Sequence, residues 1–395
     1  MQDKERILEM VASGIITPEE AVQLLECLEN ADSLQKDMPA VPKLEFPPMP
    51  EDTALPKVLD SPSAPQSAES TAKIPYENAL VPTQIAPQSC DYAHEHPASA
   101  ITSLNVSWIN GTVDIRPYKG KAINVTEYSK NPLSEEEKLD MYEQDGTLYI
   151  NWDKKGELFS LHTITKMIGR IFLSKQLLIE VPEEMAKQML VIDCNTVSSE
   201  LLCANFVCEN MRMTTTSGKI RLAGISVENL KTRSVSGSVN VNNVSAENFE
   251  AGSTSGSVHA SHVSSNNFAM DSTSGSVHAG NFFAECARLN STSGSIHSSG
   301  TANRLYMETV SGSIKAEVKM PVSEIRTSTV SGSTKLYLSQ NNGFTVQYSS
   351  VSSKLKSEYS LSGDVKGKSG TAVFGDGSII MSMNSVSGSM KINKF

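Results

Sequence analysis

The sequence lacks the motifs that most enzymes and membrane-spanning proteins carry. No run of 18 apolar residues is present, and none of the six cysteines forms a Cys-x-x-Cys pair. Phosphate-binding loops, Gly-x-Ser-x-Gly, His-Glu-x-x-His and calcium-binding Gly-Gly-x-Gly-x-Asp repeats are all absent. We therefore predict a protein that is not an enzyme and has no cofactor and no metal, with its cysteines as free thiols.

Basic residues are fewer than acidic residues, and the excess of acidic residues is concentrated in the first 100 positions. Residues 1–100 hold 17 acidic and 6 basic residues, whereas the remaining 295 residues are almost balanced. No basic stripe suited to nucleic acid is present, so no nucleic-acid partner is expected. The start, Met1–Leu8, is charged and helical rather than a secretory signal, so we expect the protein either to stay in the cytoplasm or to leave it by a route that the sequence does not show.

What the chain does have is a repeat. A Ser-Gly-Ser phrase returns between about Thr214 and Thr334. Five of its glycines follow each other at 19 residues and two more follow after 18 and 20: Gly218, Gly237, Gly256, Gly275, Gly294, Gly312 and Gly332. Gly388 fits the series three steps further on, if two imperfect repeats lie between. A fixed period of about 20 residues is typical of stacked repeats.

Around each glycine the side chains alternate with a period of two, which predicts strands. Apolar residues stand two positions after the glycine, as at Val239 and Val258, and often twelve after it, as at Phe249 and Phe268. A rung of this length leaves no room for a helix. The fold class is therefore mainly β, a parallel β-solenoid (β-helix) of about 19-residue rungs.

The residue two before each glycine is always threonine or valine: Thr216, Val235, Thr254, Thr273, Thr292, Val310, Val330 and Val386. Because these side chains have nearly the same shape, we predict that they point into the core. This orientation weakens the hypothesis of an ice- or carbohydrate-binding threonine ladder. When the repeats are aligned on their glycines, their acidic residues do not recur at one position. No catalytic carboxylate pair is therefore predicted.

Residues 1–31 are predicted to form a small α-helical hairpin. Thr17, Pro18 and Glu20 make a strong helix start, since threonine caps, proline suits the first helical position and Glu20 completes a capping box. So small a unit buries little surface, which favours a protein partner or self-association.

The phrase from Lys4 to Leu25, with Ser13-Gly14-Ile15-Ile16-Thr17-Pro18-Glu19-Glu20, resembles the SHOCT-like N-terminal domain of YvlB-like and LiaX-like bacterial proteins. In those proteins it precedes a "putative adhesin" β-repeat domain of unknown function, which the Ser-Gly-Ser-Val repeats at 214–334 resemble. The resemblance implies a non-enzymatic protein associated with cell-envelope stress in Gram-positive bacteria. It also implies association with the membrane or the cell surface.

Two sections separate the hairpin from the repeats at 199–395. Residues 32–98 hold 12 of the 17 prolines and little periodicity, which predicts a disordered linker. Residues 99–198 are predicted to form a β section with mainly antiparallel strands, which caps the solenoid. Within it, Asn110-Gly111 and Asp145-Gly146 each lie between short apolar strands and predict hairpin turns.

The position three after the glycine is polar or basic and is predicted to face outward. It holds Arg221, Asn240, His259, His278, His297, Lys315, Lys335 and Lys391. Three stacked imidazoles could bind a transition metal or act as a pH switch. The basic neighbours argue against a metal and favour an anionic partner, such as a cell-wall polymer or a lipid head group. The alternative is a polar exterior without a ligand.

The stretch Leu158–Lys175 follows helical spacing, with Lys166, Arg170 and Lys175 among its apolar residues. It could lie on an anionic membrane as an amphipathic helix, or pack as an insertion over the first rung.

The function predicted from the sequence is that of an envelope-stress-associated protein with two parts. Its solenoid is a binding scaffold, and its N-terminal hairpin contacts another protein. The alternative is a regulator of a membrane-bound stress-signalling system, with the hairpin as output.

Overall fold

In the computed structural model, the described residues are 90–97, 101–152 and 175–395 without 364 and 366. All of them belong to one compact unit, Ser70–Phe395. The predicted hairpin at 1–31, most of the predicted linker, Lys166 and Arg170 lie outside the described residues. Among the described residues, no helix has the length and apolar character needed to cross a membrane.

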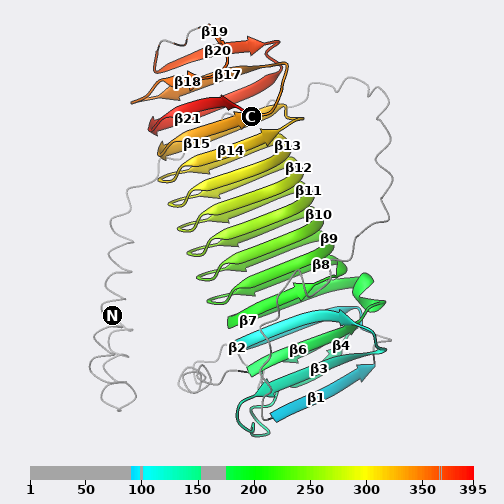
Figure 1. Ribbon diagram of the computed structural model, residues 1–395. Coiled ribbons are helices and arrows are strands. Elements are labelled where there is room, and N and C mark those ends of the chain that lie inside the picture. The colour runs from blue at the N-terminus through cyan, green and yellow to red at the C-terminus, as the bar shows by residue number, and fades with distance from the viewer. Residues whose placement is uncertain (1–89, 98–100, 153–174, 364, 366) are drawn as a thin grey trace, which may run out of the picture. The chain divides into compact units, whose positions relative to one another are not determined.

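The centre of this unit is a stack of parallel strands, which confirms the predicted solenoid (Figure 1). Its strands are β7 (Met189–Ala204), β8 (Val207–Thr215), β9 (Ile220–Ser234), β10 (Val239–Ser253), β11 (Val258–Ser272), β12 (Val277–Ser291) and β13 (Ile296–Thr309). Paired residues are 19 positions apart from β7 to β12, as Val239 and Val258 are, and the spacing falls to 18 after a register shift at Gly280, where β12 meets β13. The chain therefore stacks on itself in the register that the glycine spacing predicts.

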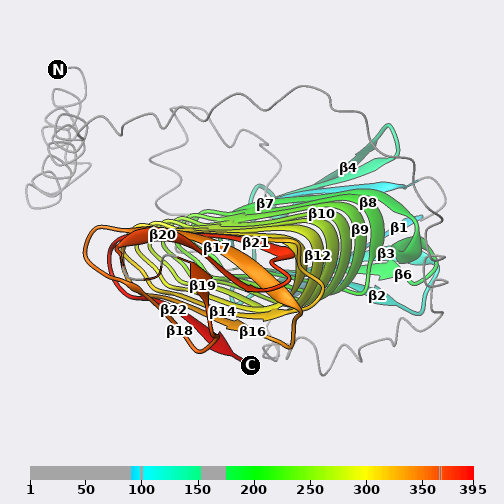
Figure 2. The same ribbon diagram turned by 90° about the horizontal axis from the view of Figure 1, so that it is seen from above.

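Each rung contributes to two sheets that enclose the core. β13 pairs with β14 (Ile314–Lys319) along its first half and with β15 (Glu324–Ser331) along its second half. We call the sheet that continues through β14 the first sheet, and the one that continues through β15 the second sheet. Seen from above, β14, β16 and β22 lie on one side and β17, β20 and β21 on the other (Figure 2). Between the sheets, Val258 is fully buried, and the rings of Phe249, Phe268 and Phe282 stack at 4.9 Å.

The stack already begins at β2 (Ser103–Tyr118), which pairs in parallel with β7. The predicted hairpin at Asn110-Gly111 is therefore wrong, because this single strand runs through it. Gly111 has a φ of +111°, and a Cβ there would lie 1.8 Å from the carbonyl oxygen of Lys175. Asn110-Gly111 is thus a corner of the first full rung, where a neighbouring rung approaches too closely for a side chain.

Antiparallel strands cover this end of the stack. β1 (Cys90–Pro97) pairs with β3 (Ala122–Ser129), which pairs with β6 (Lys175–Pro182). β4 (Asp140–Gln144) and β5 (Thr147–Asn151) form the hairpin predicted at Asp145-Gly146. A short 3-10 helix, η2 (Met185–Lys187), precedes β7. Two predictions need correction: β1 lies within the predicted linker, and the predicted boundary at 198/199 falls inside β7.

At the other end the chain folds back into its own stack. It continues through β16 (Thr334–Leu338), β17 (Gly343–Ser350), β18 (Leu355–Ser357), β19 (Ser362–Gly363), β20 (Ser369–Gly375), β21 (Ile379–Ser387) and β22 (Met390–Lys394). β21 lies between β15 and β17, and β22 lies between β16 and β18. Gly388 consequently stacks directly on Gly332, one rung away rather than three. The strand that is last in sequence is therefore not the last in the stack, because β17 and β18 lie beyond β21 and β22.

Candidate binding faces of the solenoid

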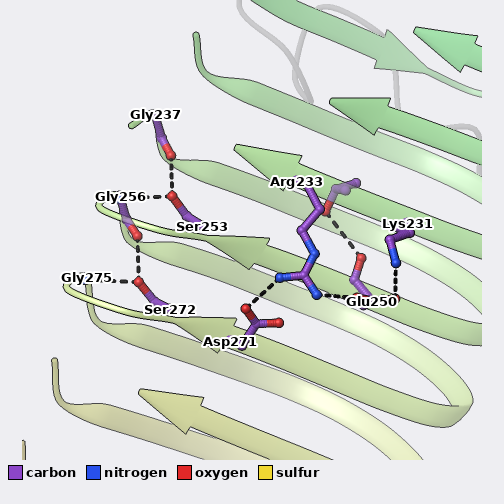
Figure 3. Close-up of polar contacts among 10 residues, drawn as sticks. Lys231, Arg233, Gly237, Glu250, Ser253, Gly256, Asp271, Ser272 and Gly275 are labelled. Carbon is purple, nitrogen blue, oxygen red and sulfur yellow. Dashed lines mark hydrogen bonds and ion pairs between the residues drawn. The ribbon is translucent and has the colours of Figure 1, made fainter. Parts of the chain in front are cut away.

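The Ser-Gly corners form a hydrogen-bonded ladder along one edge (Figure 3). The Ser253 hydroxyl donates to the carbonyl oxygen of Gly237 in the previous rung, at 2.8 Å, and accepts from the Gly256 amide at 2.9 Å. Ser272 repeats both contacts one rung on. A Cβ on Gly256 would lie 2.1 Å from the Gly237 oxygen, which explains the repeated glycine. These serines therefore hold the corners together and are not placed as nucleophiles.

The threonine and valine column points outward, contrary to our prediction. Val235 is 48% exposed, and Val310, Val330 and Val386 are similar. The chain turns directly after the buried serine, so two successive residues face solvent and the alternation is interrupted. The outward direction of these side chains therefore does not argue against a ligand-binding threonine ladder. The valines in the column do argue against it, because they interrupt the row of threonines.

The predicted basic column exists as one continuous line on the first sheet. Register places Arg221, Asn240, His259, His278, His297 and Lys315 on successive rungs. The three imidazoles stack almost in parallel, with ring centroids 4.6 and 4.8 Å apart. Partial burial lowers the pKa of His259, and burial with the neighbouring His259 and His297 lowers the pKa of His278. At neutral pH His259 and His278 are therefore mostly uncharged.

Three lysines continue the column beyond Lys315. Lys335 follows Lys315, Lys391 follows Lys335, and Lys356 follows Lys391. Sequence spacing had placed the first two in this column, but Lys356 joins it only because β22 inserts beside β18. Arg221 pairs with Glu200 at 3.1 Å and Lys315 with Glu317 at 3.2 Å. Among the described residues, no acidic side chain forms an ion pair with Lys335, Lys391 or Lys356, so the positive charge is concentrated there.

Lys175 does not face solvent, so its predicted membrane contact is wrong. Its side chain is fully buried and pairs with the equally buried Glu127. The ammonium also donates to the carbonyl oxygens of Trp152 and Glu137, each at 2.7 Å. It lies 4.2 Å from the Trp152 ring centroid and 4.9 Å from that of Trp108. The Lys175 ammonium is therefore held inside the core, near the corner at Asn110-Gly111, and is not accessible to a lipid surface.

One acidic column was missed. Glu209, Glu228, Glu247 and Glu285 occupy the same position of their rungs, with Asn266 at that position on the rung between the last two, and all four glutamates are exposed. Counting ten residues on from each corner would have found them. Within the part of the chain that the structure describes, no group of three or more His, Cys, Asp or Glu side chains is arranged to hold a metal ion.

A second charged cluster on the outer surface joins three rungs (Figure 3). Arg233 contacts Glu250 of the next rung and Asp271 of the rung after it, the latter at 2.6 Å. Gly252 lies between, where a Cβ would come within 2.3 Å of the guanidinium. Lys231 also pairs with Glu250, at 3.1 Å. The two positive and two negative charges of the cluster balance each other, so we interpret it as a contact that holds neighbouring rungs together.

The cysteines behave as buried thiols where the structure describes them. Cys194, Cys203 and Cys208 are buried, Cys286 is half-buried, and all four are free. Burial raises the pKa of the Cys208 thiol to about 12 and that of the Cys194 thiol further, so neither is a nucleophile at neutral pH.

Comparison with known proteins agrees with this architecture. A family model described as "Toastrack DUF4097" matches residues 101–251 and again 233–393, and a SHOCT-like domain model matches residues 2–32. The chain thus carries an adhesin-like β-repeat scaffold behind a SHOCT-like domain. No curated protein matches it.

Two of the solved structures that match this chain are described as putative adhesins. The one from Parabacteroides distasonis is 9% identical, covers 78% of this chain and 97% of its own, and has a TM-score of 0.42. The one from Bacteroides fragilis is 14% identical, covers 78% and 99%, and has a TM-score of 0.34. The descriptions of the family and of these structures name no reaction.

Proposed function

This chain belongs to the toastrack DUF4097 family, and we propose that its solenoid is a non-catalytic scaffold that binds an anionic polymer of the bacterial envelope through the basic column. The observation that carries the proposal is the run of Lys315, Lys335, Lys391 and Lys356 on adjacent rungs of the first sheet. Adjacent rungs lie about 4.8 Å apart. A linear polyanion laid along the stack would meet one cation at each rung.

The three imidazoles extend this surface at lower pH. Each protonated histidine would add a positive charge in line with the lysines. Binding should therefore strengthen as the pH falls below 6.5 and weaken with added salt, because the contacts are exposed charges. If the column is a polar exterior without a ligand, polyanion binding should depend on pH and salt no more than binding at any other exposed lysine does.

Binding to linear polyphosphate, measured by calorimetry at low salt, tests the proposal. Replacing Lys335 and Lys391 by glutamine should weaken binding by about tenfold, since each exposed ionic contact contributes up to about 1 kcal/mol. The matched control replaces Lys119 and Lys121, which are exposed and change the net charge equally away from the column. Equal losses in both variants, or no binding by the original protein, would contradict the proposal. Binding to anionic vesicles but not to polyphosphate would point to a lipid surface instead.

We infer that residues 1–31 recruit a protein partner or a second copy. The support is the SHOCT-like match at residues 2–32 and the small apolar face predicted for the hairpin. Light scattering and pull-downs with the full chain and with a chain lacking residues 1–31 test this. If both capture the same proteins and have the same mass, the inference fails.

The association with envelope stress, which the family resemblance implies, is part of the same proposal. The support is the combination of a SHOCT-like domain with the DUF4097 repeat. Cells treated with a cell-wall antibiotic should hold more of the protein in the membrane or wall fraction. In the alternative, a signalling regulator, loss of residues 1–31 would change stress-gene expression while leaving polymer binding unchanged.

A further inference from the structure

A hollow of about 470 Å³ lies on the outer face of the second sheet, where the chain folds back into its stack. Its lining includes Glu324, Arg326, Gln347, Thr371, Ile380 and Ser382. These residues come from β15, β21, β17 and β20, so segments up to 58 positions apart in sequence meet in this hollow.

Register explains why the surface is hollow there. Ser382 in β21 pairs with Arg326 on one side and with Gln347 on the other. Gln347 in turn pairs with Thr371 of β20. A short side chain in the middle rung thus lies between longer ones on the rungs beside it. The result is a depression along β21 with Arg326 as one wall and Gln347 as the other.

Ile380 supplies an apolar patch in the same depression. It lies between Glu324 and Thr345 in the register and is 55% exposed, one of the more exposed large apolar side chains of the described chain. An exposed isoleucine among hydrogen-bonding groups costs solubility unless something covers it.

The polar groups of the hollow are available to a ligand. Among the described residues, no hydrogen bond engages the side chains of Gln347, Thr371 or Ser382. Together they offer an amide and two hydroxyls, which can both donate and accept.

Glu324 is held in place as an acceptor. The Tyr306 hydroxyl donates to it at 2.8 Å, and the Arg326 guanidinium donates to its other oxygen. Partial burial alone would raise the pKa of Glu324, but these hydrogen bonds and the nearby arginines outweigh it and lower the pKa. The carboxylate therefore stays charged at neutral pH and can accept hydrogen bonds from a ligand.

We propose that this hollow is a saccharide-binding site. Sugar rings present hydroxyls around their edge and C–H groups on their face, which matches polar walls around an isoleucine floor. A peptide strand is a poorer match, because the backbone groups of β15, β21 and β17 are already paired with each other. The site lies on the second sheet, whereas the basic column lies on the first, so the two proposals are independent.

Cellotetraose, chitotetraose and mannotetraose are suitable probes, because neutral sugars avoid the basic column. With the full-length protein, saturation-transfer difference NMR and calorimetry should detect binding of at least one of them, with little dependence on salt. Gln347→Ala should weaken that binding about three- to tenfold, as expected for one lost hydrogen bond.

Ser382→Arg should weaken binding by at least about tenfold, because the longer side chain fills the depression. Ser264→Arg is the matched control, since Ser264 is an exposed serine of β11 far from the hollow. It should leave saccharide affinity unchanged, and melting curves should show that both variants fold. Polyphosphate binding should be retained by both. If none of the three sugars binds, or if both arginine variants lose binding equally, the proposal is overturned.

Discussion

The middle of the solenoid and its two ends are built on different principles. From β9 to β13 the rungs repeat two kinds of contact: a buried serine or threonine bridges the corners, and apolar side chains stack on their counterparts. At the ends the contacts are unique. One end depends on the buried Lys175–Glu127 pair, and the other on a C-terminal rung inserted between two earlier ones.

The difference shows how a repeat protein finishes its stack. Identical rungs can add indefinitely, and an uncovered last rung would pair with other chains. This protein covers one end with antiparallel strands around a buried ion pair. It covers the other by returning the chain, so that the rung last in sequence is not last in space.

The largest effect should follow removal of residues 379–395. This deletion takes away β21 and β22, which lie between β15–β16 and β17–β18. We expect β17 to β20 to lose protection against hydrogen exchange while β9 to β11 remain protected, because contacts in a stack are local. Mass spectrometry of peptide exchange measures this. Complete unfolding in one step would instead show that the ends and the middle form a single cooperative unit.

A pair of valines tests the inward and outward faces of the middle. Val258 is fully buried and Val235 is 48% exposed. Val258→Asp should destabilise the fold by at least about 4 kcal/mol, because it buries an unpaired charge. Val235→Asp should change stability by no more than about 0.5 kcal/mol. Urea titration measures both, and similar losses for the two would refute the assigned faces.

The buried ion pair tests the first end. Lys175→Ala leaves Glu127 charged and unpaired in the core and should cost about 3–5 kcal/mol. Replacing both residues, with Glu127→Gln and Lys175→Met, should recover part of that loss, because no buried charge remains. A double variant no more stable than Lys175→Ala would mean that the tryptophan packing, rather than the charge pairing, closes this end.

The corner ladder should show a smaller effect. Ser253→Ala leaves the Gly256 amide and the Gly237 carbonyl without their shared hydroxyl, which should cost about 1–3 kcal/mol. Ser255→Ala, two residues on and exposed, is the control and should be nearly neutral. Equal values for the two serines would show that the ladder is not a source of stability.

The smallest effect concerns pH. The pKa values of His259 and His278 are lowered in the fold by burial, so the unfolded chain binds more protons near and below pH 6.5. Their contribution to stability is present above that pH and is lost as the pH falls through the lowered values. Replacing both by asparagine should flatten the dependence of the melting temperature on pH between about 5 and 7. An unchanged slope would mean that other groups control it.

Local pattern was enough to predict the middle of the molecule. The spacing of the glycines predicts the register, and the alternation around Val239, Val258 and Phe268 predicts which side chains are buried. The stacked histidines follow from the same counting. These features depend on residues within one rung and on exact repetition, so a single sequence contains them.

The tertiary structure alone decided the rest. Asn110-Gly111 has the composition of a hairpin turn, yet the neighbouring rung makes it a corner. Val235 points outward because the corner interrupts the alternation, and Lys175 is buried because Glu127 in β3 forms an ion pair with it. The place of β21 between β15 and β17, and with it the hollow around Ser382, depends on which distant strand edges remain open. Such pairings follow from contacts between residues far apart in the chain, and spacing along the sequence does not encode them.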